Sequence, residues 1–128
     1  AATFKCDDKV VEELVAESLR MQINAAVADS LGLCVFGRSV TDENLELIAN
    51  AINDAFDAGV TPDFIRNIGV DTLRLEAAFN NAAGFSEDDD ELPAFFLEEP
   101  LPPTGKMARL YSREVNAAMQ NLMEAQSL

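Results

Sequence analysis

The stretch TDENLELIANAINDAFDAGVTPDFIRNIGVDTLRLEAAF, residues 41–79, decides the fold. Its apolar residues recur at steps of three and four, the spacing of one face of an α-helix, and Gly59 divides the stretch into two helices. We expect Thr41 to cap the first helix, and the second to begin at Pro62 after the cap Thr61. The expected buried stripe of the first helix is Leu45, Ile48, Ala49, Ile52, Ala55 and Phe56. Two successive amphipathic helices favour an all-α fold.

The second helix of this stretch should continue towards Gly84, and it contains a glycine in its interior. Gly69 costs about 1 kcal/mol relative to alanine at such a position. We therefore expect Gly69 to lie in close contact with another element. The expected apolar stripe is Phe64, Ile65, Ile68, Thr72, Leu75 and Phe79.

Two more helices and one irregular arm flank this pair. The amino-terminal flank predicts a long helix from about residue 7 to 31, ended by Gly32, and the carboxyl-terminal flank predicts one over 107–125. Between them, residues 85–105 carry four prolines and read as an extended arm. Four apolar residues of this arm are expected to lie against the helices or a neighbouring domain: Phe95, Phe96, Leu97 and Leu101. The fold class predicted is all-α, a helical bundle of about four main helices with an extended Pro-rich arm, in a single helical domain over residues 1–128.

Composition and charge exclude several classes of function. A net charge of −14 would repel a phosphate backbone, so nucleic acid is not an expected partner. The sequence contains no histidine, which excludes a self-contained histidine-dependent hydrolase. No apolar run is long enough to cross a membrane, and the two cysteines indicate no disulfide scaffold. We expect a reduced, cytoplasmic setting and no membrane partner.

The segment DSLGLCVFG, residues 29–37, points to chemistry. It puts the Asp29 carboxylate on the last helical turn, Gly32 at the helix end and the Cys34 thiol two residues later. An acceptor, free carbonyl groups at the helix end and a soft metal ligand would share one small volume. From the residues alone, Cys34 is expected to be a buried apolar-like residue, because a lone cysteine supplies one ligand where an iron–sulfur cluster needs four.

The pattern Asp29-x-x-Gly32-Leu33-Cys34 resembles one of the two pterin-binding motifs of the tungsten-containing aldehyde:ferredoxin oxidoreductases, the copy near their carboxyl end. Three further segments, in the same order, look like the carboxyl-terminal helical domain of that family. They are TLRLEAAFNNAAGF at 72–85, DDELPAFF at 89–96 and EPLP at 99–102. The resemblance covers roughly residues 10–105.

This resemblance implies a role for each matching residue. Asp29 would accept hydrogen bonds from a pterin of tungstopterin or molybdopterin, and Gly32 and Leu33 would supply backbone approach beside it. Cys34 would be the last of four thiolates that hold a 4Fe-4S iron–sulfur cluster, and Cys6 matches no ligand position. The parent enzyme would oxidise an aldehyde to a carboxylic acid and pass the electrons to ferredoxin.

The chain lacks the other three cluster cysteines of the family, spaced C-x-x-C-x-x-x-C, and the second pterin motif. We therefore expect it to be the carboxyl-terminal part of a larger enzyme, without a catalytic residue of its own and inactive alone. Its expected partners are the remaining domains of the oxidoreductase or a companion subunit.

Other interpretations stay open at this point. The chain could be a helical protein-interaction module without redox chemistry, or an exported domain with a disulfide between Cys6 and Cys34. Arg38 could contact a cofactor phosphate or be an ordinary surface arginine. The acidic run 88–91 invites a calcium site, but it lacks the alternating ligands and the glycine of an EF-hand loop, so a solvated loop or helix start is favoured.

Overall fold

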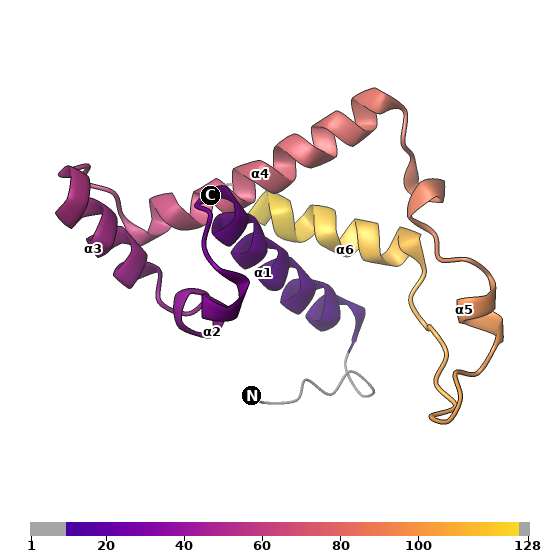
Figure 1. The fold of residues 1–128 in the computed structure, drawn as a ribbon. Coiled ribbons are helices and arrows are strands. Elements are labelled where there is room, and N and C mark those ends of the chain that lie inside the picture. Colours follow the sequence, from indigo (N-terminus) through magenta and orange to yellow (C-terminus); the bar gives the residue numbers. More distant parts are fainter. Residues whose placement is uncertain (1–9, 126–128) are drawn as a thin grey trace. The chain divides into compact units, whose positions relative to one another are not determined.

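The structure, a computed structural model, describes residues 10–125 of the chain (Figure 1). Within this range the chain forms helices and an isolated β-bridge between Leu101 and Lys106, so the predicted all-α class is confirmed. The elements in order are α1 (Val11–Ser30), η1 (Val35–Gly37), α2 (Arg38–Thr41), α3 (Leu45–Phe56), α4 (Pro62–Ala83), η2 (Glu87–Asp90), α5 (Phe95–Glu98) and α6 (Ser112–Ala125). The four main helices predicted correspond to α1, α3, α4 and α6. Within 10–125, no helix combines the length and apolarity needed to cross a membrane.

The chain divides into two compact units. We call Ser18–Asn80 the core unit, and we call the described residues 10–17 and 81–125 the arm unit. The boundary between them passes through α1 and α4. The Asp29–Cys34 motif therefore belongs to the core unit.

The core unit is built on apolar side chains from α1, α3 and α4. Leu19, Ile23 and Val27 are buried at successive steps of four along α1, as expected for one helix face. The hydrophobic cluster consists of Val27, Ile48, Ala49 and Ile65, with Leu31, Leu33, Leu45, Ile52, Val60 and Ile68 packed against it. Ile65 on α4 has an exposed fraction of 0%. This cluster lies beside the carboxyl end of α1 and so supports the motif that follows.

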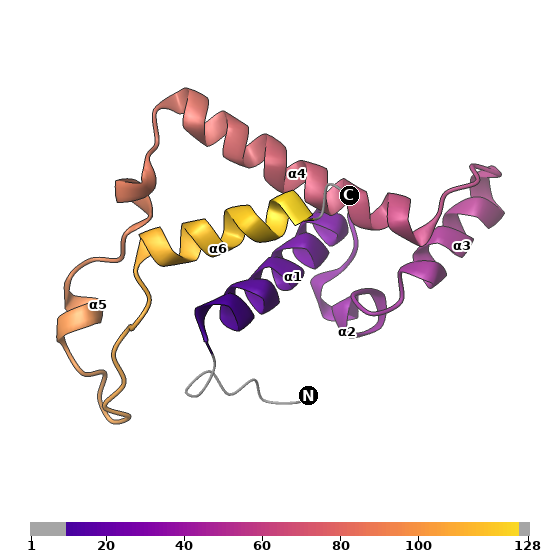
Figure 2. The same ribbon diagram turned by 180° about the vertical axis from the view of Figure 1, so that it is seen from behind.

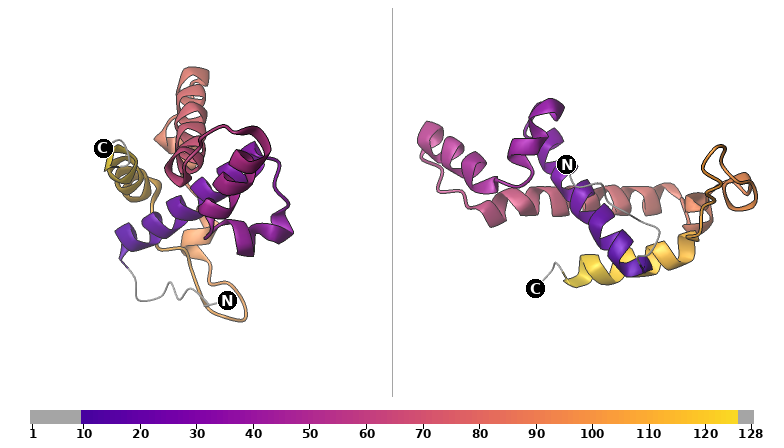
Figure 3. Two further views of the ribbon diagram at one scale, coloured as in Figure 1. Left: turned by 90° about the vertical axis from the view of Figure 1, so that its left-hand side faces the viewer. Right: turned by 90° about the horizontal axis from the view of Figure 1, so that it is seen from below.

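Helices α1 and α4 cross at Gly69 (Figure 3). A Cβ built on Gly69 would overlap the carbonyl oxygen of Ile23 and lie 2.9 Å from Cγ2 of Val27. The expected close contact of this glycine is confirmed, because only a residue without a side chain lets the two backbones approach so closely. The crossing fixes the part of α1 that leads into the motif.

The end of α3 and the start of α4 agree with the sequence in part. Thr61 caps α4 as predicted: its Oγ1 accepts the Phe64 N–H at 3.1 Å, and Pro62 is the first helical residue. Helix α3, however, ends at Phe56, with Asp57 in the left-handed region at φ 49°, before Gly59 is reached. The turn between the helices is braced from within the core unit, because the Asn53 side chain bonds both the N–H and the C=O of Val60.

The predicted cap of α3 is wrong. Thr41 is the last residue of α2, and the cap is Asn44, whose Oδ1 accepts the Leu47 N–H at 3.1 Å. Residues 38–42 form a helical turn of their own, in which the Asp42 N–H donates to the Arg38 carbonyl. This separate turn moves the start of α3 to Leu45.

Several residues expected in the buried stripes of α3 and α4 are exposed. Ala55 and Phe56 at the end of α3 face solvent, and the buried face of α4 stops at Val70. The large apolar residues of α4 that are exposed are Phe64, Leu75 and Phe79. The predicted stripe is correct for Ile48 and Ala49 of α3 and for Ile65 of α4, and it is wrong for these exposed residues.

The arm unit contains α6 and a chain of turns rather than a continuous extended arm. Helix α6 begins at Ser112, five residues later than predicted, because the Ala108 N–H donates to the Phe96 carbonyl at 2.7 Å and holds this stretch in a non-helical path. Figure 2 shows the arm doubling back so that η2 lies near the first turn of α6. There the Glu91 carboxylate accepts both the N–H and the hydroxyl of Ser112.

The apolar residues of the arm are only partly covered. Phe95 and Phe96 contact each other, with ring centroids 4.2 Å apart, yet both remain exposed. Leu101 is exposed as well, and Leu97 is half-buried. The arm reaches a helix through the carboxylates of Asp90 and Glu91, which contact α6, and the exposed Phe95, Phe96 and Leu101 do not show the packing expected of them.

Candidate functional site

The motif begins where α1 ends in a Schellman turn. Gly32 adopts φ 66°, the Gly32 N–H donates to the Asp29 carbonyl at 3.2 Å, and the Leu33 N–H donates to the Ala28 carbonyl at 2.8 Å. Gly32 ends α1 as predicted. The carbonyls of Ala28 and Asp29 are therefore occupied, so the expectation of free carbonyl groups at the helix end is wrong for these two.

Leu33 and Gly32 have different surroundings. The Leu33 side chain packs against the cluster that contains Val27 and Ile48, and this anchors the turn to the core unit. A Cβ on Gly32 would meet no atom within 4 Å, so its surroundings are open. The glycine is needed for its backbone conformation, because other residues rarely adopt a positive φ.

Cys34 is an exposed free thiol. Its backbone is extended, at φ −66° and ψ 129°, and its carbonyl accepts the Gly37 N–H at 2.9 Å to start η1. The disulfide alternative is not tested, because its other member, Cys6, lies outside the described residues. A cysteine sealed in the core would have removed any ligand role, and Cys34 is not sealed.

Asp29 is exposed on the last turn of α1, five residues before Cys34. Both groups of the motif are open to solvent, one on each side of the Schellman turn. The residues after Cys34 are apolar and exposed as well: Phe36 has an exposed fraction of 93%, and Val35 and Val40 are exposed. Three exposed apolar side chains thus follow the thiol within six residues of the sequence.

Arg38 forms an ion pair. Its Nη2 lies 3.0 Å from Oδ2 of Asp42, and its Nε donates to both carboxylate oxygens. The guanidinium is thereby engaged within the protein, which favours the interpretation as an ordinary arginine over that as a phosphate contact. The i,i+4 spacing of the two residues is a recognisable signal in the sequence, and the sequence reasoning did not use it.

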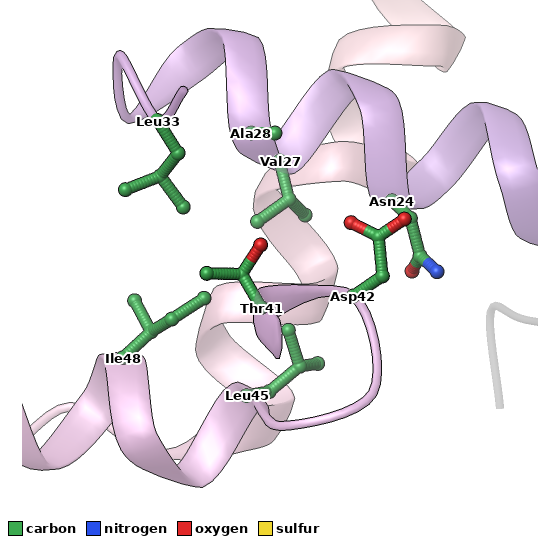
Figure 4. Close-up of a pocket in the computed structure, with 8 residues that line it drawn as sticks. All are labelled: Asn24, Val27, Ala28, Leu33, Thr41, Asp42, Leu45 and Ile48. Atoms are coloured by element: carbon green, nitrogen blue, oxygen red, sulfur yellow. The ribbon is translucent and has the colours of Figure 1, made fainter. Parts of the chain in front are cut away.

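A crevice between α1, α2 and α3 lies beside the motif (Figure 4). Its lining residues are Asn24, Val27, Ala28, Leu33, Thr41, Asp42, Leu45 and Ile48. The crevice leaves no room for a water molecule. It is a packing seam that holds α2 to α1, and not a ligand pocket.

The acidic run 88–91 acts as a set of hydrogen-bond acceptors. The N–H of Ser86, and then its hydroxyl, stabilise the charged Asp89 carboxylate and lower its pKa. The hydroxyl of Ser112, and then its N–H, do the same for Glu91 and lower its pKa. Asp90 accepts from the Asn116 side chain at 2.9 Å. The run lies in η2, whose capping box joins Ser86 and Asp89, so the helix-start interpretation is confirmed; across residues 10–125 no group of three or more His, Cys, Asp or Glu side chains is placed to hold a metal ion.

Comparison with protein families decides the membership of the chain. Residues 5–125 match the family model described as aldehyde ferredoxin oxidoreductase, domains 2 and 3. The chain belongs to the aldehyde ferredoxin oxidoreductase family. No curated protein and no solved structure matches it.

Membership of the aldehyde ferredoxin oxidoreductase family confirms the resemblance and places the chain in an oxidoreductase context. The match also extends beyond residues 10–105 and takes in α6. A domain of this family belongs with other domains of a larger oxidoreductase. The individual roles of Asp29, Gly32, Leu33 and Cys34 stay predictions.

Proposed function

We propose that the chain is a helical domain of a tungstopterin aldehyde:ferredoxin oxidoreductase, which oxidises an aldehyde to a carboxylic acid and passes the electrons to ferredoxin. It supplies one wall of the site at which the pterin and a 4Fe-4S cluster lie. The observation that carries this proposal is the exposed free thiol of Cys34, directly after the Schellman turn of α1. Molybdopterin in place of tungstopterin would use the same residues.

The donor set of this chain fits one part of such a site. Cys34 contributes one soft thiolate of four, and an iron–sulfur cluster is held by thiolates. The cluster, when bound, supplies one-electron transfer. The exposed Asp29 carboxylate accepts hydrogen bonds from the pterin, and the open surroundings of Gly32 admit a ligand close to the backbone.

The other ligands must come from elsewhere. One thiolate cannot hold a cluster. Among the described residues, no group of three or more His, Cys, Asp or Glu side chains is placed to hold a metal ion. The remaining domains of the oxidoreductase, or a companion subunit, are the partners that this proposal requires. The isolated chain is therefore expected to be inactive.

The exposed apolar residues beside Cys34 are consistent with a partner domain that covers them in the complete enzyme. Val35 and Phe36 follow the thiol directly, and apolar side chains in such a row are commonly buried by a partner. The same observation suits a helical protein-interaction module without redox chemistry. Iron binding separates the two functions, since only the first needs the Cys34 sulfur.

The test replaces Cys34 by serine in the complete enzyme. Serine oxygen is a poor substitute for a thiolate as an iron ligand, so the iron content should fall by most of one cluster while the helical circular dichroism is unchanged. Cys6→Ser is the matched control and should keep its iron. An undiminished iron content in Cys34→Ser would reject the assigned role and favour the interaction module.

A further inference from the structure

The four residues that carry the thiol, 34–37, are tied to α1 at their amino-terminal end. The Leu33 N–H donates to the Ala28 carbonyl at 2.8 Å, and the Leu33 side chain lies in the hydrophobic cluster of the core unit. The backbone therefore enters Cys34 from a fixed position. The thiol is exposed, but the chain before it is not free to move.

The same four residues are tied to α1 at their carboxyl-terminal end by Arg38. Its Nη2 donates to the Met21 carbonyl on α1, 17 residues away, at 3.5 Å. The Asp42 carboxylate accepts from the same guanidinium, through Nε and Nη2, and the Arg38 and Asp42 side chains are only 27% and 23% exposed. Figure 4 shows Asp42 directed towards Asn24 of α1, and both residues line the same crevice.

Short hydrogen-bonded turns connect the Arg38 tie to the cysteine. The Arg38 N–H donates to the Val35 carbonyl, and the Gly37 N–H donates to the Cys34 carbonyl at 2.9 Å. A displacement of Arg38 would thus be transmitted within one turn to the backbone of Cys34. The side chains of Val35 and Phe36 add no restraint, since both are exposed.

We propose that Arg38, oriented by Asp42, is a positioning residue that fixes the backbone of Cys34 against α1. The inference rests on the proposed function, because a ligand to a metal cluster must be held within about 0.5 Å of its productive place. Arg38 acts through the turn 34–37 and does not itself touch the cluster. The plane of its guanidinium suits this role, since one side chain can donate to Asp42 and to the Met21 carbonyl at once.

The first test measures amide hydrogen exchange in the full chain, without any cofactor. In Arg38→Ala and in Asp42→Asn, the Gly37 amide should exchange about two- to fivefold faster, the change expected from a partly exposed ion pair. The Leu33 amide, held by the Schellman turn, should keep its rate. Arg74→Ala is the matched control, because Arg74 forms an ion pair with Asp71 elsewhere in the core unit. An unchanged Gly37 rate in both variants would overturn the proposal.

The second test asks whether the positioning reaches the cluster. In the complete enzyme, Arg38→Ala should change the electron paramagnetic resonance spectrum of the reduced cluster, and Arg38→Lys, which keeps the charge, should restore it in part. A spectrum identical to that of the parent enzyme would overturn the role in positioning the ligand. Full iron retention in Cys34→Ser would instead reject the proposed function. The Gly37 exchange rates, measured without cofactor, would still test whether Arg38 restrains the backbone of residues 34–37.

Discussion

The interactions that stabilise the core unit differ from those that stabilise the arm unit. Most buried apolar side chains of the described chain belong to the core unit, whereas the arm unit contributes only Val15 and Ala118. In the arm unit, α6 is fastened instead by the carboxylates of Asp90 and Glu91. Apolar burial responds little to pH, but hydrogen bonds to a carboxylate depend on its charge. The two regions should therefore respond differently to substitution and to acid.

The largest effect is expected from Ile65→Ala. This side chain is fully buried in the hydrophobic cluster, and removal of such a side chain costs about 2–5 kcal/mol through lost burial and the cavity left behind. Thermal unfolding followed by circular dichroism gives the change in stability. Leu75→Ala is the control: Leu75 lies on the same helix with an exposed fraction of 71%, and its loss should cost less than about 0.5 kcal/mol. Equal losses for both would contradict an apolar core at Ile65.

A smaller loss is expected from Gly69→Ala. The added methyl group would overlap the Ile23 carbonyl oxygen and Val27, and overpacking of this kind costs about 1–3 kcal/mol. Gly37→Ala, where a Cβ would meet no atom, should change stability by less than about 0.5 kcal/mol. Urea unfolding of the two variants measures the difference. A Gly69→Ala protein as stable as the parent would mean that the helices do not approach each other so closely.

The smallest effect is expected in the arm unit, from Glu91→Gln. The amide side chain removes the negative charge that accepts the N–H and hydroxyl of Ser112. The first turn of α6 should exchange its amide hydrogens faster, while the amides of α3 keep their rates. Asp88→Asn is a matched change in the same acidic run, and it should leave the Ser112 amide unaffected. A loss of thermal stability as large as that of Ile65→Ala would contradict the expected difference between the units.

Acid should sharpen the contrast further. Because Ser112 favours the charged form, the pKa of Glu91 lies below its ordinary value of 4.5. The stabilisation is therefore fully present above pH 4.5 and is lost as the pH falls through the lowered pKa. The Ser112 amide resonance, followed by nuclear magnetic resonance, should shift in this range and should not do so in Glu91→Gln. A shift that persists in the variant would assign the transition to another group.

The fold could be predicted from the sequence wherever one local signal was strong. Helical spacing located the four main helices, and Thr61 with Pro62 marked the start of α4 correctly. Thr41 failed as a cap because an ion pair between Arg38 and Asp42 stabilises a separate turn before α3. The start of α6 was placed too early because the contacts around it, from Phe96 to Ala108 and from Glu91 to Ser112, join residues far apart in the sequence, and spacing within a helix carries no information about them.

The sequence predicted the residues of the candidate site, but it did not predict the hydrogen bonds that hold their backbone in place. The motif pattern alone pointed to Asp29 and Cys34, and the structure leaves both exposed. Periodicity could not show that the turn occupies the Ala28 and Asp29 carbonyls, because this depends on the left-handed conformation of Gly32. The tie through Arg38 was equally hidden, since it joins residues 17 positions apart.

The crossing at Gly69 also restricts how this domain can change its length. A residue inserted into α4 between Ile65 and Gly69 would rotate everything after it by about 100°, so a side chain would replace the hydrogen atom that faces Ile23. Insertions and deletions are therefore expected to collect in the turns around Gly59 and Gly105, where an added Cβ meets no atom. Gly69 thus fixes the position of α1 along α4, and this also fixes the distance from the helix crossing to the Cys34 thiol.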